Sequence, residues 1–240
     1  MNITQRPSPN MTKGRNGWTP DIIVCHITDG AFDGAVSWVT NPSSQVSYHY
    51  LVARDGRIVN AVDIRNTAWA NGTNNSTDGR GNMHSRLATV RERKVNANLY
   101  TVSVGFEGRH VETGGSLTQI QLDAGVWLIN QIRKNIRATF GTENLIPANR
   151  NHIVGHVDIT PRWRPNCPGA SFPFDEIIMR LGREGTAAVP ALPISNTPSR
   201  WASNAWEWAI QAGITDGTNP QGTATREQMI QLLYNFSHYL

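Results

Sequence analysis

Three residues within the first 170 positions have the side chains of a zinc site. His26 lies in the segment DIIVCHITDG, His156 in IVGHVDIT, and Cys167 in RPNCPGASF. Zinc prefers imidazole and thiolate ligands, and three protein ligands instead of four leave one coordination position open, as in catalytic zinc sites. If folding brings these three side chains together, they predict a hydrolytic centre with one zinc ion per chain.

The other cysteine, Cys25, directly precedes the first of these histidines. Neighbouring side chains of an extended segment point to opposite faces. If His26 faces a site, Cys25 therefore faces the packed side, and we expect it to be a small buried hydrophobe. A disulfide between Cys25 and Cys167 is the alternative, although two cysteines are too few for a disulfide-stapled scaffold.

Strands and helices must position the three ligands. Residues 21–27 form a continuous apolar run, typical of a buried central strand, and Thr-Asp-Gly ends it. His26 is therefore expected at the end of a strand, where open α/β sheets commonly form their sites. Further along, the patterns predict a helix over 33–40, a hairpin from QVSYHYLVA through the turn 54–57 into IVNAV, and a long polar surface loop over 66–96.

The next segments complete one α/β domain. They predict a strand in LYTVSVGFEG, an amphipathic helix opened by a Thr118–Gln121 capping box, a short strand in NHIVGHV, and a helix ending at Gly182. This order indicates a mixed central β-sheet flanked by helices over residues 1–182. Residues 183–197 read as a proline-containing linker, and residues 198–240 as a small α-helical module. This module, rich in Trp, should dock on the first domain or self-associate into a homo-oligomer.

The chain has a formal net charge of +4, and its positive excess lies before residue 198. A basic body suits an anionic partner such as a bacterial wall. Dense Lys/Arg runs and aromatics interleaved with basic residues are missing, so a nucleic-acid partner is not expected. No apolar run approaches the roughly 18 residues of a membrane span. The first residues lack the apolar core of a signal peptide, so we expect synthesis in the cytoplasm.

Six segments together resemble the zinc-dependent N-acetylmuramoyl-L-alanine amidases of the type 2 amidase family, which includes phage lysozyme-amidases and is related to peptidoglycan recognition proteins. They are IIVCHITDG, VSYHYLVARDGRIVNAV, TAWANG, SVGFEG, LTQIQLDAGVWLI and VGHVDITPRWRPNCPG, and they follow the family's order over nearly all of residues 1–182. The resemblance implies hydrolysis of the amide between N-acetylmuramic acid and the L-alanine of the stem peptide.

The resemblance also implies roles for single residues. It makes His26, His156 and Cys167 the zinc ligands, Glu107 the catalytic carboxylate and Tyr48 the active-site tyrosine. A carboxylate can move a proton from water to the leaving nitrogen, and a phenol can donate to the developing oxyanion. The alternatives are a solvated strand-end acid for Glu107 and a core aromatic for Tyr48.

Two other histidines lie close to the proposed site residues in the sequence. His49 points to the opposite face from Tyr48 in the expected strand, so we interpret it as structural or as a group behind the site. His152 would share a strand face with His156. It is therefore either a group that supports a ligand or a competing choice of ligand.

Two positions depart from the family pattern. Many relatives carry a basic or hydroxyl residue two positions before the last ligand, where this chain has Pro165, so Arg164 or Asn166 is the candidate replacement. The tryptophan loop of relatives often continues with His, whereas Ala70 follows Trp69 here. The resemblance still implies substrate contacts from this loop, through Trp69 and Asn71.

The tail resembles a single S-layer homology module, through RWASNAWEWAIQAGITDG and the Thr-Arg-Glu of NPQGTATREQM. Such modules bind secondary cell-wall polymers, commonly in sets of three. A helical hairpin that merely stabilises the enzyme is the alternative. The whole pattern predicts a peptidoglycan hydrolase, a phage or prophage endolysin of a Gram-positive host that reaches the wall after holin-type release or lysis. The alternatives are a bacterial autolysin, a non-catalytic peptidoglycan recognition protein, and an amidase or peptidase acting on another bond or on soluble muropeptides.

Overall fold

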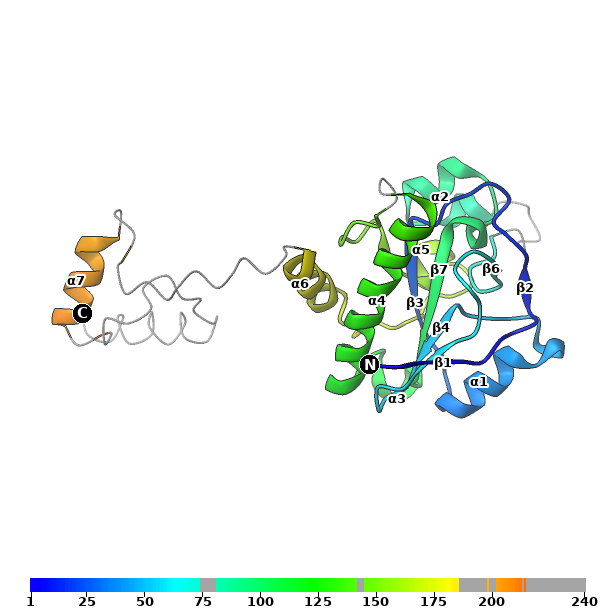
Figure 1. The fold of residues 1–240 in the computed structure, drawn as a ribbon, viewed down its shortest axis with the longest axis horizontal. Coiled ribbons are helices and arrows are strands. Elements are labelled where there is room, and N and C mark those ends of the chain that lie inside the picture. Colours follow the sequence, from blue (N-terminus) through cyan, green and yellow to red (C-terminus); the bar gives the residue numbers. More distant parts are fainter. Residues whose placement is uncertain (74–80, 142–144, 186–197, 199–201, 213, 215–240) are drawn as a thin grey trace. The chain divides into compact units, whose positions relative to one another are not determined.

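The computed structural model describes residues 1–73, 81–141, 145–185, 198, 202–212 and 214. The chain divides into two compact units, Met1–Gly185 and Thr186–Leu240, which we describe separately (Figure 1). The linker expected at 183–197 lies almost wholly outside the described residues, and so does the second helix expected in the tail.

A six-stranded mixed sheet forms the centre of the first unit, in the order β1-β5-β4-β7-β3-β8. β3 pairs in parallel with both β7 and β8, β4 is parallel to β7, and β4 and β5 form the antiparallel hairpin. The strands are β1 Ile3–Gln5, β3 Ile22–Ile27, β4 Tyr50–Val52, β5 Ile58–Asn60, β7 Thr101–Phe106 and β8 Ile153–Gly155. A separate antiparallel pair joins β2 Met11–Thr12 to β6 Thr67–Ala68. The expected α/β class with a mixed central sheet is confirmed.

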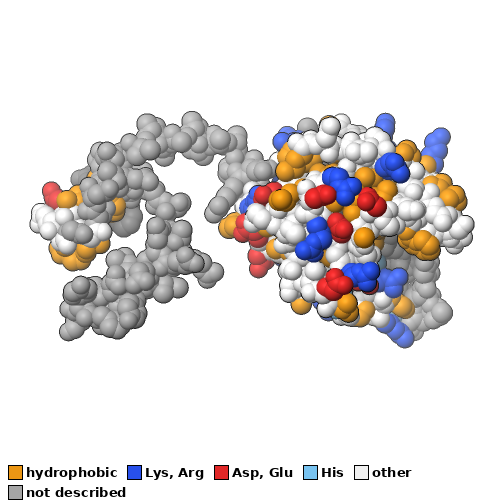
Figure 2. Space-filling model, turned by 90° about the horizontal axis from the view of Figure 1, so that it is seen from below, with side chains coloured by type: hydrophobic (Ala, Val, Ile, Leu, Met, Phe, Trp, Pro, Cys, Tyr) orange, Lys and Arg blue, Asp and Glu red, His pale blue; other side chains and the backbone are white. Residues whose placement is uncertain are grey.

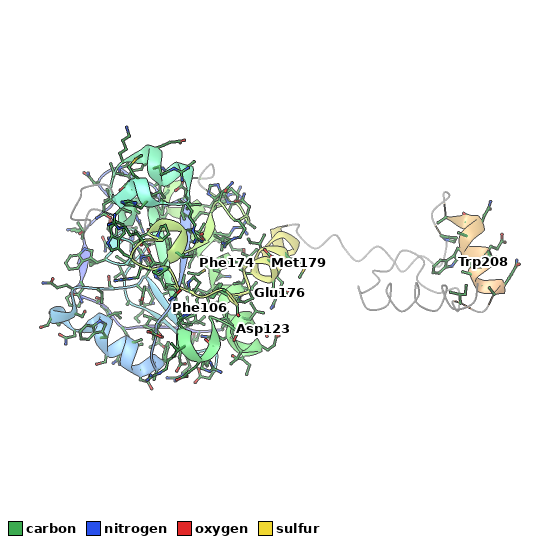
Figure 3. All side chains as sticks on the ribbon, turned by 180° about the vertical axis from the view of Figure 1, so that it is seen from behind. Phe106, Asp123, Phe174, Glu176, Met179 and Trp208 are labelled. Atoms are coloured by element: carbon green, nitrogen blue, oxygen red, sulfur yellow. The ribbon has the colours of Figure 1, made fainter. Side chains whose placement is uncertain are left out.

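One face of the sheet packs against two long helices, α4 Gln119–Phe140 and α6 Phe174–Gly185. Cys25 and the alternate residues of β7 lie in this core, because side chains alternate along a strand. Phe106 of β7 contacts Phe172, which in turn contacts Phe174 at the start of α6 (Figure 3). Asp123 of α4 and Arg180 of α6 form an ion pair of 2.8 Å.

The opposite face has two separate covers. α1 Phe32–Thr40 packs over β4 and β5, while α2 Ala88–Arg93 and the 3-10 helix η3 Ala97–Tyr100 pack over β3 and β8. His26 belongs to this face, two residues beyond Val24, and its strand partner on β7 is Gly105. The face is therefore packed on either side of His26, at the carboxyl end of β3.

The polar segment 66–96 differs from the surface loop that we expected. Its described residues include β6, the 3-10 helix η2 Gly81–His84 and α2. Asn82 is buried, and its side-chain amide donates to the carbonyls of Val90 and Val95. The polar side chains here satisfy backbone groups inside the protein, so composition alone suggested solvent exposure where the chain is packed.

The strand that we expected over NHIVGHV is also shorter than predicted. β8 ends at Gly155, and His156 opens the short helix α5 His156–Ile159. The carboxylate of Asp158 accepts a hydrogen bond from the Gly155 amide at 2.8 Å, which starts the helical turn. β4 is likewise confined to Tyr50–Val52, and α6 continues three residues past Gly182.

Three helices remain, α3 His110–Thr113, the 3-10 helix η1 Pro42–Ser44, and α7 Ser203–Gln211 in the second unit. Trp208 of α7 has 57% of its surface exposed (Figure 3). Within the part of the chain that the structure describes, every helix is too short or too polar to span a bilayer.

Candidate metal centre and its cleft

The three side chains predicted to bind zinc converge. One ligand atom from each of His26, His156 and Cys167 lies within 4.8 Å of the other two. Sγ of Cys167 is 3.8 Å from Nδ1 of His26, and the two imidazole rings are 4.5 Å apart between centroids. Tetrahedral zinc, with Zn–S of about 2.3 Å and Zn–N of about 2.1 Å, would separate such a sulfur and nitrogen by about 3.6 Å. The three donors therefore fit one zinc ion.

Close backbone packing holds the two later ligands together. The amide of Val157, next to His156, donates to the carbonyl of Cys167 at 2.8 Å. Gly155 makes room for this approach, because a Cβ there would lie 2.7 Å from Cδ of Pro168. The carboxyl ends of β3 and β8 thus bring His26 beside the loop that carries the thiol.

Burial sets the protonation of the ligand atoms. Desolvation, followed by the charge of His156, lowers the pKa of His26 well below its usual value. Desolvation and then Arg164 lower the pKa of His156 to about 3, and desolvation raises the pKa of Cys167 to about 11. Both imidazoles are therefore neutral with lone pairs to donate, and a metal must displace the thiol proton. The disulfide alternative is wrong, since both cysteines are free and Cys25 faces the α4 core.

A cleft of ≈ 690 Å³ opens over the three ligands. The cleft is also lined by residues of the expected substrate-binding and helper positions, which are Tyr48, Trp69, Ala70, Arg164, Pro165 and Asn166. The indole nitrogen of Trp69 donates to Oγ1 of Thr12 at 2.9 Å, which fixes the ring at the cleft. Arg164 is exposed and donates to the carbonyl of its neighbour Trp163 at 3.0 Å.

Tyr48 lies against the first ligand. Its ring centroid is 4.9 Å from that of His26, and burial raises the pKa of its phenol above the usual value. The hydroxyl therefore keeps its proton and can act as a hydrogen-bond donor. Gly105 leaves space for the ring, because a Cβ at this position would lie 2.9 Å from Cδ2 of Tyr48.

Glu107 lies one residue past β7 and is held by backbone groups. Its Oε1 accepts from the amide of Phe32 at 3.0 Å, and its Oε2 accepts from the amide of Arg54 at 2.8 Å. Phe32 is the first residue of α1, so the carboxylate ties β7 to the start of that helix. Glu107 is not one of the described residues that line the cleft. The structure thus brings Tyr48 and Arg164 into the cleft with the ligands, whereas Glu107 is anchored to the start of α1 and to Arg54 outside the cleft lining.

Asn71 does not lie where a substrate contact would be. It is fully buried, and its side-chain nitrogen donates to Oγ1 of Thr101 at 2.9 Å and to Oγ of Ser103 at 2.8 Å. A side chain without exposed surface cannot touch a wall polymer, so its expected role in substrate binding is corrected. Asn71 instead lies behind the metal centre, against β7.

Two further histidines considered from the sequence, His49 and His152, do not join the centre. His49 is buried, and its Nδ1 accepts a hydrogen bond from the amide of Ser103 at 3.0 Å, so its role is structural. Nδ1 of His152 lies 2.8 Å from the carbonyl of Asp21, at the opposite end of β8 from His156. His152 is therefore not a ligand.

Two aromatic side chains of the cleft were not among the predicted site residues. Trp38 of α1 has 57% of its surface exposed and Trp163 has 37%. Large aromatics kept in solvent beside a cleft offer flat surfaces for a sugar or an apolar side chain. Trp163 has a usable sequence signal, because it lies between two arginines just before the last ligand. Trp38 has none, since one Trp in a short amphipathic helix reads as core.

Comparisons with known proteins find relatives of this chain. The family model described as N-acetylmuramoyl-L-alanine amidase matches residues 16–170. N-acetylmuramoyl-L-alanine amidase A of Achromobacter lyticus is 25% identical over 162 residues, which cover 63% of this chain and 77% of that protein.

Solved structures support the fold. The endolysin N-acetylmuramoyl-L-alanine amidase LysCS from Clostridium intestinale URNW is 18% identical, with a TM-score of 0.50, over 75% of this chain and 95% of that one. The PlyG catalytic domain is 19% identical, also with a TM-score of 0.50, over 79% of this chain and 98% of that one.

Proposed function

The chain belongs to the N-acetylmuramoyl-L-alanine amidase family, and from this we propose that residues 1–182 hydrolyse the amide between the lactyl group of N-acetylmuramic acid and the L-alanine of the stem peptide. One observation carries the proposal. His26, His156 and Cys167 converge with their ligand atoms within 4.8 Å of one another, and all three line one cleft.

We propose one zinc ion per chain as the cofactor, held by these three side chains. A zinc ion in such a site lowers the pKa of water and polarises a carbonyl oxygen, both of which an amide needs for hydrolysis at neutral pH. The neutral imidazoles and the soft sulfur of Cys167 are the donor set that supports this choice over magnesium or calcium, which prefer oxygen ligands.

The protein's own groups handle the charge and the protons. Tyr48 keeps its phenol proton and lies beside His26, so it is placed to donate to the oxygen of the amide as negative charge develops there. Arg164 is our candidate for the second donor, since Pro165 cannot serve and the guanidinium acts on the pKa of both histidine ligands. Both groups would stabilise the transition state more than the substrate.

Glu107 is our candidate for the group that moves the proton from water to the leaving nitrogen. Its two backbone hydrogen bonds fix the carboxylate, and catalytic hydrogen bonds often form only when the substrate is bound. For substrate binding we propose Trp69 together with Trp38 and Trp163, which place three indole rings along the cleft.

At the level of the whole chain, we propose a cell-wall lytic enzyme in which residues 198–240 bind a secondary cell-wall polymer. A phage or prophage endolysin of a Gram-positive host, released through a holin, is the setting that fits a wall-binding tail. An autolysin would carry the same chemistry. A non-catalytic recognition protein is disfavoured, because the third ligand, Cys167, is present together with Glu107.

Mass spectrometry of the products from defined cell walls, with and without a chelator, tests the proposal. We expect new amino-terminal L-alanine and no new reducing sugar ends. When the chelator removes zinc, we expect both the clearing of the wall suspension and the release of product to stop. Reducing ends without free L-alanine would indicate a glycosidase instead. Wall binding without any product would indicate a recognition protein.

A further inference from the structure

We propose that Asn71 is a positioning residue for the metal ligand His26. Its side-chain oxygen accepts a hydrogen bond from Nε2–H of His26, and this fixes the imidazole tautomer in which Nδ1 is free to bind the metal. The inference rests on the proposed metal site, but it concerns a residue whose side chain does not reach the cleft.

The hydrogen bonds of Asn71 determine which way its amide points. Oγ1 of Thr101 donates its own proton to the carbonyl of Ala97 at 2.8 Å, so towards Asn71 it can only accept. The atom of Asn71 that faces Thr101 and Ser103 must therefore be the nitrogen, which has two protons for the two hydroxyls. The oxygen, Oδ1, is left pointing away from them.

Oδ1 of Asn71 and Nε2 of His26 are both among the buried polar atoms that lack a hydrogen-bond partner in the described part of the chain. One is an acceptor and the other can carry a proton. A buried polar group without a hydrogen bond destabilises the folded state, so a donor and an acceptor that both lack partners are expected to pair. The carboxamide of Asn71 also acts on the pKa of His26 as a hydrogen-bond partner, in the raising direction.

The register of the sheet places the two residues together. Ser103, which holds the Asn71 amide, pairs with Val24, and Gly105 pairs with His26. Ser103 and His26 thus lie on adjacent strands and on the same sheet face, with a register offset of two residues.

The other ring nitrogen has the opposite environment. Nδ1 of His26 lies 3.8 Å from Sγ of Cys167, on the metal side of the ring. Histidines that bind metals almost always donate their second N–H to an oxygen, which fixes the tautomer and orients the ring. In His26 this second nitrogen is Nε2, and Asn71 supplies the oxygen.

The first test needs no variant. Long-range ¹H–¹⁵N NMR of the metal-free, full-length protein at pH 7.5 reports which nitrogen of His26 carries the proton. We expect a single tautomer with the proton on Nε2. A dominant Nδ1–H tautomer, or rapid exchange between the two forms, would overturn the proposal.

The second test compares two variants of matched position. Asn71→Leu keeps a similar volume but removes the oxygen, whereas Ser103→Ala removes a partner of the amide nitrogen and leaves the oxygen in place. From chelator competition we expect Asn71→Leu to bind zinc about 10–100-fold more weakly. We expect Ser103→Ala to keep the wild-type dissociation constant.

A thermal melt of both metal-free variants separates positioning from folding, and Asn71→Asp, which restores an oxygen, should recover zinc affinity. Equal zinc affinity in Asn71→Leu and the wild type, or equal losses in Asn71→Leu and Ser103→Ala, contradicts the positioning role. None of these readouts uses the peptidoglycan substrate, so a wild-type protein that binds zinc but releases no L-alanine would refute the amidase function and leave this inference standing.

Discussion

The two cysteines of this chain show how local surroundings give one residue type two different roles. Cys25 and Cys167 are both free, but Cys25 lies in the core under α4 and its neighbour His26 faces the other side of the sheet. Burial keeps each thiol protonated, and only Cys167 has two imidazoles beside it. A metal bound at Cys167 can therefore replace the thiol proton. Cys25 is not part of the group of metal-binding side chains among the described residues, so its thiol keeps its proton.

This difference predicts that Cys167→Ala loses both zinc and amidase activity, while Cys25→Ala keeps both. Removing one of three ligands leaves two neutral imidazoles, which bind zinc too weakly to retain it through gel filtration. Cys25→Ala removes only a buried sulfur and should cost about 1 kcal/mol of stability. Zinc content by mass spectrometry and release of L-alanine check both variants. A zinc-loaded, active Cys167→Ala would show that the centre is not the one proposed.

For Glu107 we predict that Glu107→Gln and Glu107→Ala both retain zinc but lose turnover by about 10²–10⁴-fold. Gln keeps a neutral oxygen for one of the two amides of Phe32 and Arg54, so its melting temperature should fall less than that of Ala. A purely structural carboxylate would behave differently. It would make kcat follow the melting temperature, with Glu107→Gln nearly as active as the wild type.

His156 makes the metal-free protein sensitive to acid. Burial lowers its pKa from 6.5 to about 3, so the folded state holds it neutral while the unfolded state takes up a proton below pH 6.5. The contribution of the His156 pKa shift to the free energy of unfolding is therefore fully present above pH 6.5. It is lost progressively as the pH falls towards 3, by at most about 5 kcal/mol.

Urea unfolding of the metal-free protein at several pH values between 7.5 and 4.5 measures this loss. The control is His156→Gln, which removes the titrating group and should reduce the slope of unfolding free energy against pH. His26 is shifted in the same direction, so a smaller slope should persist in this variant. An unchanged slope in His156→Gln would show that other groups cause the acid sensitivity.

At the scale of elements, strongly periodic segments were predictable from the sequence. The apolar run of β3 and the amphipathic pattern of α4 appear as expected, and Thr118 caps α4 by accepting from the amide of Gln121 at 3.1 Å. Segment 66–96 was not predictable, because its polar side chains bond to backbone groups that come from distant parts of the chain. Ser85, for example, donates to the carbonyl of Asp158.

The same limit applies to the site. The types and order of His26, His156 and Cys167 indicated a metal centre, and the structure brings their ligand atoms together. The position of Asn71 behind that centre depends on hydrogen bonds to Thr101 and Ser103, which lie about thirty residues later in the sequence. A pattern of neighbouring residues contains no information about such a contact.

Packing between elements gives a prediction for Gly105. A Cβ there would lie 2.9 and 3.0 Å from two ring carbons of Tyr48, so Gly105→Ala must displace a buried ring beside His26. We expect a loss of about 1–3 kcal/mol of stability and a lower kcat, with zinc affinity less affected.

Gly182 provides the matched control, because a Cβ at this position in α6 meets nothing within 4 Å. Gly182→Ala should be neutral or stabilising by up to about 1 kcal/mol, as expected for alanine in a helix. Chemical unfolding and steady-state kinetics of both variants make the comparison. Wild-type kcat in Gly105→Ala would show that the position of the Tyr48 ring does not matter for turnover.

At the scale of the whole molecule, the proposed catalytic residues are confined to one of the two compact units. Every residue assigned to the metal centre and its cleft belongs to the first unit, Met1–Gly185. On the face of that unit in Figure 2, basic and acidic side chains are interspersed, so the net charge of +4 is not gathered in one patch there. Such a charge distribution is expected to give only a weak, non-specific attraction to an anionic wall.

Specific attachment to the wall is therefore expected to need the tail. Deleting residues 198–240 should leave the melting temperature of the first unit and the hydrolysis of soluble muropeptides unchanged, because the cleft lies wholly before residue 186. Sedimentation with intact walls should decrease, and the binding that remains should fall further as salt screens the basic body. If the truncated protein sediments as well as the full chain at every salt concentration, the first unit alone must recognise the wall, and the tail would have a structural role or an oligomerising one.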